Sequence, residues 1–289
     1  MEHNFVFITD DSCDLPRQYL SDHEIEVLQL SYSIEGETFM AYDLTPKEFY
    51  GRLREGKMPT TAQIFPEQAR EFMKPFLDEG KDIFYAAFSS GLSGSCNSAM
   101  MAAKELSEKY PDRKIIVVDG LAASMGEGLI IYKLQKLRES GATIEEMAKW
   151  VEDNRDQVVH IFTVDDLMHL HRGGRVSKVS AVAGSMLGIK PILHLDVDGK
   201  LKVIDKARGR KRALEEVVAK AKACVGNASN DIFMVSHADS EEDAKAVAEM
   251  VKAELGIKDC MINYIGPVIG SHTGQGCIAL FMMGEKKKP

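Results

Sequence analysis

Four serines and two glycines, within residues 89–95, follow an apolar run in the segment FYAAFSSGLSGSCNSAM, residues 84–100. The apolar run is typical of a buried strand, and the small residues after it are typical of a helix. Such a turn fits a serine nucleophile, an anion site or a capped turn without a ligand. The nucleophile-elbow pattern G-x-S-x-G is not matched around Ser93, because Ser95 stands where the second glycine belongs.

An anion site explains more of this turn than capping does. Gly91 and Gly94 allow backbone amides to face a ligand, and the N-terminus of the following helix adds partial positive charge. Ser90 and Ser93 add hydroxyl donors, whereas capping alone needs one serine. We therefore favour an anion site, with a serine esterase that uses Ser93 and an unliganded turn as alternatives.

Two further segments carry groups that could serve the same site. KMPTTAQ, residues 57–63, contains Thr60 and Thr61, which either stabilise the loop or face the ligand. Neutral hydroxyls suit a carboxylate whose apolar tail is buried nearby, since a paired lysine would bring its own desolvation cost. His272 stands in a glycine-rich segment that we expect to be a loop between strands, either as filler or as a hydrogen-bond donor to a ligand.

The histidines and arginines near residue 170 allow other interpretations. His169 and His171 are two residues apart, which would put both imidazoles on one side of a strand, but without a third ligand we expect no metal site. Arg172 and Arg175 bracket two glycines, and we expect a solvated turn that pairs with the acidic residues 165–166.

A basic cluster, KVIDKARGRKR at residues 202–212, contrasts with the acidic chain around it. It is either a solvated face or a surface that docks onto an acidic partner or a phosphorylated ligand. The net charge of −8 argues against a nucleic-acid binder. Neither of the glycine pairs at 126–131 and 184–190 has the spacing of a nucleotide-binding loop.

The remaining composition predicts a cytoplasmic protein without stable membrane insertion. We find no stretch of about 18 apolar residues and no secretory leader pattern. The five cysteines are scattered and odd in number, which favours reduced thiols.

The order of elements predicts an α/β protein with two α/β domains, at residues 1–157 and 158–289. Strands expected near 4–10, 81–88 and 113–120 alternate with helices, so the first domain should hold a parallel sheet with helices on its faces. Ligands of such sheets lie beyond the carboxyl ends of the strands. The second domain should contain a helix near 178–187, a hairpin that turns at Asp198-Gly199, helices over 213–225 and 241–255, and strands over 230–238, 260–270 and 277–283.

Seven ordered segments resemble the DegV family, bacterial fatty-acid-binding proteins that deliver an acyl chain to a separate fatty acid kinase. The resemblance spans nearly the whole chain. The segments are ITDDSCDLP (8–16), MPTTAQ (58–63), SSGLSGSCNSA (89–99), HRGGRVS (171–177), IKPIL (189–193), ARGRKRAL (207–214) and GPVIGSHTGQG (266–276).

This resemblance implies a buried tunnel for one long-chain fatty acid such as palmitate, stearate or oleate, with its carboxylate near the surface between the domains. It implies that Thr61 and Ser93 hydrogen-bond the carboxylate, with His272 nearby. It also implies that Arg208 helps the kinase to use the bound fatty acid as its substrate. The protein would need no cofactor and do no chemistry, while an ATP-dependent fatty acid kinase makes the acyl phosphate. A stand-alone small-molecule kinase is the other alternative. Ala62 and Ile64 replace the serine and proline that are commoner in the family.

Overall fold

The computed structural model describes residues 4–177 and 188–286, so the helix expected near 178–187 lies outside the described residues. A four-stranded sheet forms the base of the N-terminal half, in the order β2-β1-β6-β7. All its neighbouring strands are parallel, which confirms the predicted parallel sheet. Its strands are β1 (Phe5–Asp10), β2 (Ile25–Leu28), β6 (Asp82–Ala87) and β7 (Ile115–Asp119).

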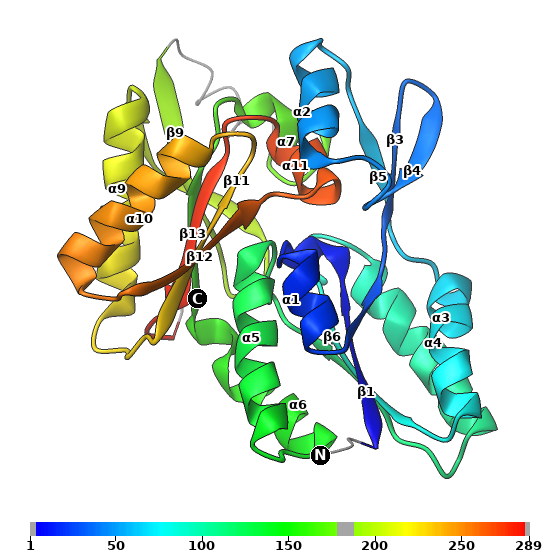
Figure 1. The fold of residues 1–289 in the computed structure, drawn as a ribbon. Helices are drawn as coiled ribbons and strands as arrows, with labels where there is room; N and C mark the ends of the chain where they lie inside the picture. Colours follow the sequence, from blue (N-terminus) through cyan, green and yellow to red (C-terminus); the bar gives the residue numbers. More distant parts are fainter. Residues whose placement is uncertain (1–3, 178–187, 287–289) are drawn as a thin grey trace.

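Helices cover both faces of this sheet (Figure 1). One face packs against α3 and α4, and the other against α1, α5 and α6. Thr143 and Glu146 form a capping box at the start of α6, with both reciprocal hydrogen bonds. The helices are α1 (Arg17–Asp22), α3 (Pro66–Asp78), α4 (Ser95–Lys109), α5 (Met125–Glu139) and α6 (Ile144–Asn154).

A second, three-stranded antiparallel sheet in the N-terminal half was not predicted from the sequence. Its order is β4-β3-β5, and its strands are β3 (Ser31–Ile34), β4 (Glu37–Met40) and β5 (Thr60–Ala62). These strands are three or four residues long, so their alternation is too brief to detect. The sheet lies with α2 (Pro46–Arg54) above the carboxyl ends of the parallel strands, and β5 carries Thr61 (Figure 1).

The C-terminal half is built on a six-stranded mixed sheet in the order β10-β9-β8-β13-β11-β12. Its hairpin turns at Asp198-Gly199 as predicted, with Leu195 opposite Leu201. The strands are β8 (Val158–Thr163), β9 (Ile189–Leu195), β10 (Leu201–Arg208), β11 (Ile232–His237), β12 (Asp259–Tyr264) and β13 (Ile278–Met283). All of them come from after residue 157, while the boundary of the two domains at that point stays a prediction.

The two faces of the six-stranded sheet are covered by different parts of the chain. Helices α9 (Arg210–Val225) and α10 (Glu241–Leu255) cover one face. The opposite face packs against α5 of the N-terminal half, in a core shared by Leu129, Phe162 and Phe281. The two halves are therefore joined by a continuous apolar core.

Two predictions of local structure were wrong. Residues 167–172 form helix α7 (Leu167–Arg172) rather than a strand, because the Asp166 side chain accepts a hydrogen bond from the Met168 amide and caps the helix. Residues 267–273 form helix α11 (Pro267–Thr273) rather than a glycine-rich loop, with Pro267 at its first position. His272 therefore lies on a helix.

Asp14 makes three hydrogen bonds, and two of them connect the two halves. Its Oδ1 accepts from the Gly266 amide at 2.8 Å, at the start of α11, and its Oδ2 accepts from Ser124 Oγ at 2.5 Å. The Asn263 side-chain amide donates to the Asp14 backbone carbonyl at 2.8 Å. Burial raises the pKa of Asp14 to about 7, and it also raises the pKa of the nearby Asp10.

These carboxyl groups predict an unusual pH dependence of stability. The Asp14 pKa is about 7 in the fold and roughly 3.9 in an unfolded chain. The stability that protonated Asp14 contributes is therefore fully present below its pKa in the unfolded chain. This contribution is lost as the pH rises through about 7, the pKa in the folded protein. Asp14→Asn should flatten the fall in unfolding free energy between about pH 4 and 8, by a few kcal/mol at most.

Urea denaturation at a series of pH values measures this slope. The exposed Asp112→Asn is the matched control and should keep the wild-type slope. Equal slopes for Asp14→Asn and wild type would show that Asp14 ionises as freely in the fold as in the unfolded chain.

Candidate functional site

A cavity of about 560 Å³ lies between the two halves of the chain. Its wall is mostly apolar and combines side chains of the six-stranded sheet with side chains of the N-terminal half. The sheet contributes Phe162, Leu195, Leu201, Ala279 and Phe281, and the N-terminal half contributes Leu30, Phe65, Phe88 and Leu92. A space of this size and lining suits an elongated apolar ligand.

Some polar groups of the cavity lining are partly open to solvent. Thr61, Ser93 and His272 all line the cavity and are half-buried, and the neighbouring Phe65 is 57% exposed. His160 and Phe281, by contrast, are buried in the lining. The structure thus brings together the three residues that the sequence suggested for a carboxylate, from three segments that lie far apart in the chain.

Thr61 and His272 form a hydrogen-bonded pair across the two halves. The Thr61 Oγ1 to His272 Nε2 distance is 2.9 Å. Burial, together with the positive charge of Arg175, lowers the pKa of His272 to about 4. His272 is therefore a neutral imidazole at pH 7, with one donor and one acceptor nitrogen. Its ring lies so close to Gly173 that a Cβ there would be 2.1 Å from Nδ1.

Ser93 belongs to the serine loop, residues 88–95, and its hydroxyl is held by Ser95. Its Oγ lies 2.9 Å from Ser95 Oγ and accepts a hydrogen bond from the Ser95 amide at 3.2 Å. Ser95 Oγ in turn accepts from the Ile64 amide at 3.0 Å. The Ser93 hydroxyl is therefore oriented by its neighbours in the loop.

The two glycines of the serine loop lie in different surroundings. A Cβ on Gly91 would lie 2.3 Å from the Asp198 carbonyl oxygen, so the backbone of residues 198–199 leaves no space for a side chain there. Gly94 lines the cavity, and a Cβ on it would meet the end of the Gln63 side chain, 2.2 Å from Oε1. Ser90, which we expected to act as a donor, does not belong to the lining of the cavity.

Arg175 lines the cavity, which its surroundings in the sequence did not predict. We expected a solvated turn paired with residues 165–166, but the half-buried Arg175 lines the cavity. Its Nε donates to the Leu92 carbonyl at 3.1 Å, and its guanidinium also donates to the Gly173 carbonyl. Burial lowers the pKa of Arg175. The only available signal was its place in the HRGGR turn, which does not show what the side chain faces.

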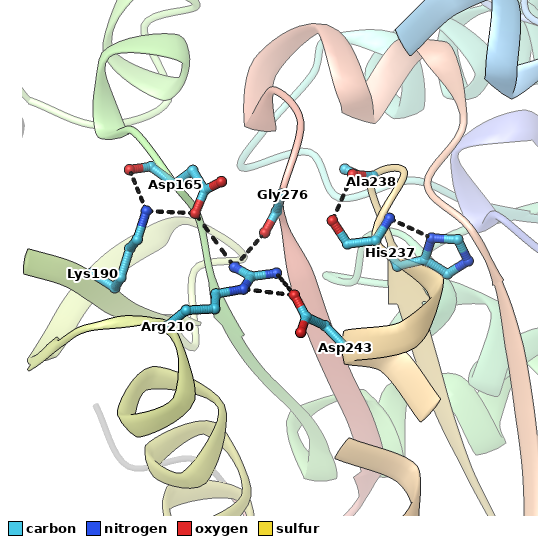
Figure 2. A network of polar contacts seen from close by, with 8 residues as sticks. Asp165, Lys190, Arg210, His237, Ala238, Asp243 and Gly276 are labelled. Atoms are coloured by element: carbon cyan, nitrogen blue, oxygen red, sulfur yellow. Dashed lines mark hydrogen bonds and ion pairs between the residues drawn. The ribbon is translucent and has the colours of Figure 1, made fainter. Parts of the chain in front are cut away.

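Asp165 pairs instead with two cations of the C-terminal half (Figure 2). Lys190 Nζ lies 2.6 Å from Asp165 Oδ1, and Arg210 Nη1 lies 3.5 Å from the same oxygen. Arg210 also donates to Asp243 Oδ2 at 2.8 Å and to the Gly276 carbonyl at 2.6 Å. This network joins the start of α9 to α10 and to the segment between α11 and β13 (Figure 2).

The basic cluster at 202–212 is only partly neutralised. Lys202 pairs with Asp196, and Arg212 pairs with Glu216. Arg208 is exposed at the end of β10, outside the lining of the cavity, and makes no ion pair with another residue that the structure describes. A role for Arg208 must therefore lie at the surface.

In residues 4–177 and 188–286, no group of three or more His, Cys, Asp or Glu side chains is arranged to hold a metal ion, His169 and His171 included. Cys13, Cys96, Cys260 and Cys277 are free thiols. No helix among the described elements is long and apolar enough to cross a membrane.

Comparison with known proteins gives full-length matches. The model of the DegV family, described as uncharacterised proteins, matches residues 4–285. A DegV domain-containing protein of Clostridium perfringens is 42% identical over 288 residues, which is 99% of each chain.

Two solved structures share the fold over almost their whole length. A stearic acid-binding protein from Eubacterium ventriosum superposes with a TM-score of 0.89 at 27% identity, covering 97% of this chain and 98% of that chain. A DegV family protein from Thermus thermophilus, described as fatty acid binding, gives 0.86 at 29% identity, covering 97% and 99%. Because the family model and these relatives match it from end to end, this chain is a member of the DegV family.

Proposed function

We propose that this protein binds one long-chain fatty acid in the cavity between its halves and presents the carboxylate to a separate ATP-dependent fatty acid kinase. The observation that carries this proposal is a mostly apolar cavity of about 560 Å³ whose lining includes the half-buried Thr61, Ser93 and His272. Relatives described as binding stearic acid and other fatty acids support the choice of ligand.

The apolar tail supplies most of the binding free energy. Burying about 14 methylenes contributes roughly 10 kcal/mol before ordering costs, at ~0.8 kcal/mol for each methylene. The aromatic and aliphatic side chains of the cavity, such as Phe162, Leu195 and Phe281, form the apolar wall for that tail. The polar groups then need only fix the position of the carboxylate.

Hydrogen-bond directions prepare two hydroxyl donors for this carboxylate. When His272 Nε2–H donates to Thr61 Oγ1, the Thr61 hydroxyl hydrogen remains available to the ligand. When Ser95 O–H donates to Ser93 Oγ, the Ser93 hydroxyl hydrogen is available in the same way. A neutral His272 suits this arrangement because one of its nitrogens keeps a proton for Thr61.

Arg175 gives the site a positive charge. It lies in the cavity lining, and its hydrogen bonds go to carbonyl oxygens rather than to a carboxylate. A buried carboxylate is costly unless a cation or hydrogen-bond donors compensate it. The site thus combines neutral hydroxyl donors with one nearby cation.

The geometry favours presentation over catalysis by this chain. A serine esterase needs an imidazole hydrogen-bonded to its nucleophile, but the Ser93 hydroxyl bonds with Ser95, and His272 bonds with Thr61. A stand-alone small-molecule kinase needs a nucleotide loop, for which neither glycine pair has the spacing. Arg208, exposed near the unpaired part of the basic cluster, is our candidate for the contact with the kinase.

Lipid extraction tests ligand binding directly. Mass spectrometry of the denatured wild-type protein should find about one fatty acid per chain. Thr61→Ala with Ser93→Ala should retain several-fold less, because two carboxylate donors are lost.

The matched control is Thr60→Ala with Ser90→Ala, which removes two adjacent hydroxyls outside the cavity lining. Absence of lipid in the wild type, even after incubation with fatty acids, would refute the proposal. A stoichiometric fluorophosphonate adduct on Ser93 would favour the esterase instead.

The ionisation of His272 reports on the bound carboxylate. In the ligand-free protein His272 should titrate near pH 4, since burial and Arg175 disfavour its charged form. A fatty-acid carboxylate beside it should raise this pKa. NMR titration of the imidazole with and without fatty acid measures the change, and an unchanged pKa would place the carboxylate away from His272.

Arg208→Ala separates lipid binding from use by the kinase. Because Arg208 lies outside the cavity, the variant should keep its fatty acid while ATP-dependent acyl phosphate formation with the kinase falls roughly 10-fold. The exposed neighbour Lys206→Ala is the control and should change the rate less. Loss of bound lipid in Arg208→Ala would mean that the residue acts on the cavity.

A further inference from the structure

The serine loop contacts the other half of the chain through a buried side chain, Ser89, in addition to the hydrogen bond from Arg175 to the Leu92 carbonyl. Ser89 is fully buried, and its hydroxyl donates to the Gly199 carbonyl oxygen at 2.9 Å. The same oxygen atom of Ser89 accepts a hydrogen bond from the Gly91 amide at 3.2 Å. Gly199 belongs to the hairpin tip, residues 196–200, which joins β9 to β10. Ser89 thus satisfies one backbone group on each side of the contact.

The backbone of the serine loop and the backbone of the hairpin tip approach each other closely here. A Cβ on Gly199, whose φ is +67°, would lie 2.1 Å from Ser89 Oγ. A Cβ on Gly91 would lie 2.3 Å from the Asp198 carbonyl oxygen. Both glycines therefore permit a close approach, and the Ser89 hydroxyl supplies the directional bond within it.

The hairpin tip is a well-defined anchor for this bond. The buried Asp196 accepts hydrogen bonds at its Oδ1 from the amides of Asp198 and Lys200, both at 2.9 Å. Its Oδ2 lies 2.9 Å from Lys202 Nζ. The carboxylate of Asp196 therefore fixes the turn that presents the Gly199 carbonyl.

Ser89 also sets the backbone that carries Ser93. The amides of Leu92 and Ser93 both donate to the Ser89 carbonyl oxygen, at 3.1 Å each. We infer that Ser89 is a positioning residue, which holds the Ser93 hydroxyl toward the ligand by anchoring the serine loop to the hairpin tip. This inference rests on the proposed fatty-acid site and adds a residue that does not itself line the cavity.

Loss of the Ser89 hydroxyl should act on the carboxylate rather than on the tail. Ser89→Ala leaves the Gly199 carbonyl and the Gly91 amide without this partner, which favours opening of the contact. The Ser93 hydroxyl would then spend less time in the binding position, while the apolar wall stays in place.

Affinities for a fatty acid and for the fatty alcohol of equal length test this distinction. Ser89→Ala should bind the acid roughly 10-fold more weakly and change the affinity for the alcohol by less than about 2-fold, because most alcohol binding comes from the tail. Ser90→Ala is the matched control in the same loop and should leave both affinities unchanged. Equal losses for acid and alcohol in Ser89→Ala would overturn the inference in favour of a general structural role.

A double-mutant cycle asks whether Ser89 acts through Ser93. In a Ser93→Ala background, adding Ser89→Ala should cause no further loss of acid affinity, because the hydroxyl that Ser89 positions is already gone. Fully additive losses would contradict the inference. A wild-type protein that binds neither acid nor alcohol would refute the proposed function itself, which is a distinguishable result.

Asp196→Ala tests the same contact from the opposite side, in case Ser89→Ala does not fold. Loosening the hairpin tip should weaken acid binding more than alcohol binding, as in Ser89→Ala. Hydrogen exchange of residues 196–200 should also become faster in either variant. Acid affinity at the wild-type level in a folded Asp196→Ala protein with faster exchange would show that the hairpin tip does not position Ser93.

Discussion

The packing of α5 against the six-stranded sheet holds the two halves of the chain together. Helices α9 and α10 cover one face of that sheet. The apolar residues of the opposite face are buried from water because they pack on the N-terminal half. Apolar burial is the dominant favourable term in folding, and it is large for side chains such as Phe162 and Phe281. The cavity lies within this same interface, so its shape depends on how the halves meet.

Hydrogen bonds between the halves add direction to this apolar contact. Thr61 meets His272 beside the cavity, and Ser89 meets Gly199 at the hairpin tip. Asp14 accepts from the amide of Gly266, which begins the helix that carries His272. Apolar packing alone would allow small shifts between the halves, whereas these bonds select one arrangement. The same arrangement brings the hydroxyls of two different segments to one site.

The electrostatics of the site suit a ligand that is anionic at one end and otherwise apolar. His272 stays neutral at pH 7 because burial and the charge of Arg175 lower its pKa to about 4. A second full positive charge would need its own compensation when the site is empty. A single cation supplemented by oriented hydroxyls avoids that cost and still offers donors to a carboxylate.

Elements with clear periodicity or capping signals can be predicted from local sequence. The parallel strands around residues 4–10 and 81–88, the capped helix that starts after Thr143, and the hairpin at Asp198-Gly199 all follow from local patterns that the structure confirms. The short strands β3 to β5 were missed, and two short helices were taken for other structure, since a few residues carry too weak a pattern.

The resemblance to the DegV family implied Thr61, Ser93 and His272 as a group, and their roles stay proposals. Three-dimensional packing shows that these residues line one cavity, that Arg175 lines it too, and that Arg208 does not. Neither Ser89 nor Ser90 belongs to the cavity lining, and Ser89 instead donates a hydrogen bond to the hairpin tip. The physical reason is that a local pattern specifies backbone conformation, while the direction and partners of a side chain depend on segments more than 100 residues away, as the pair of Ser89 and Gly199 shows.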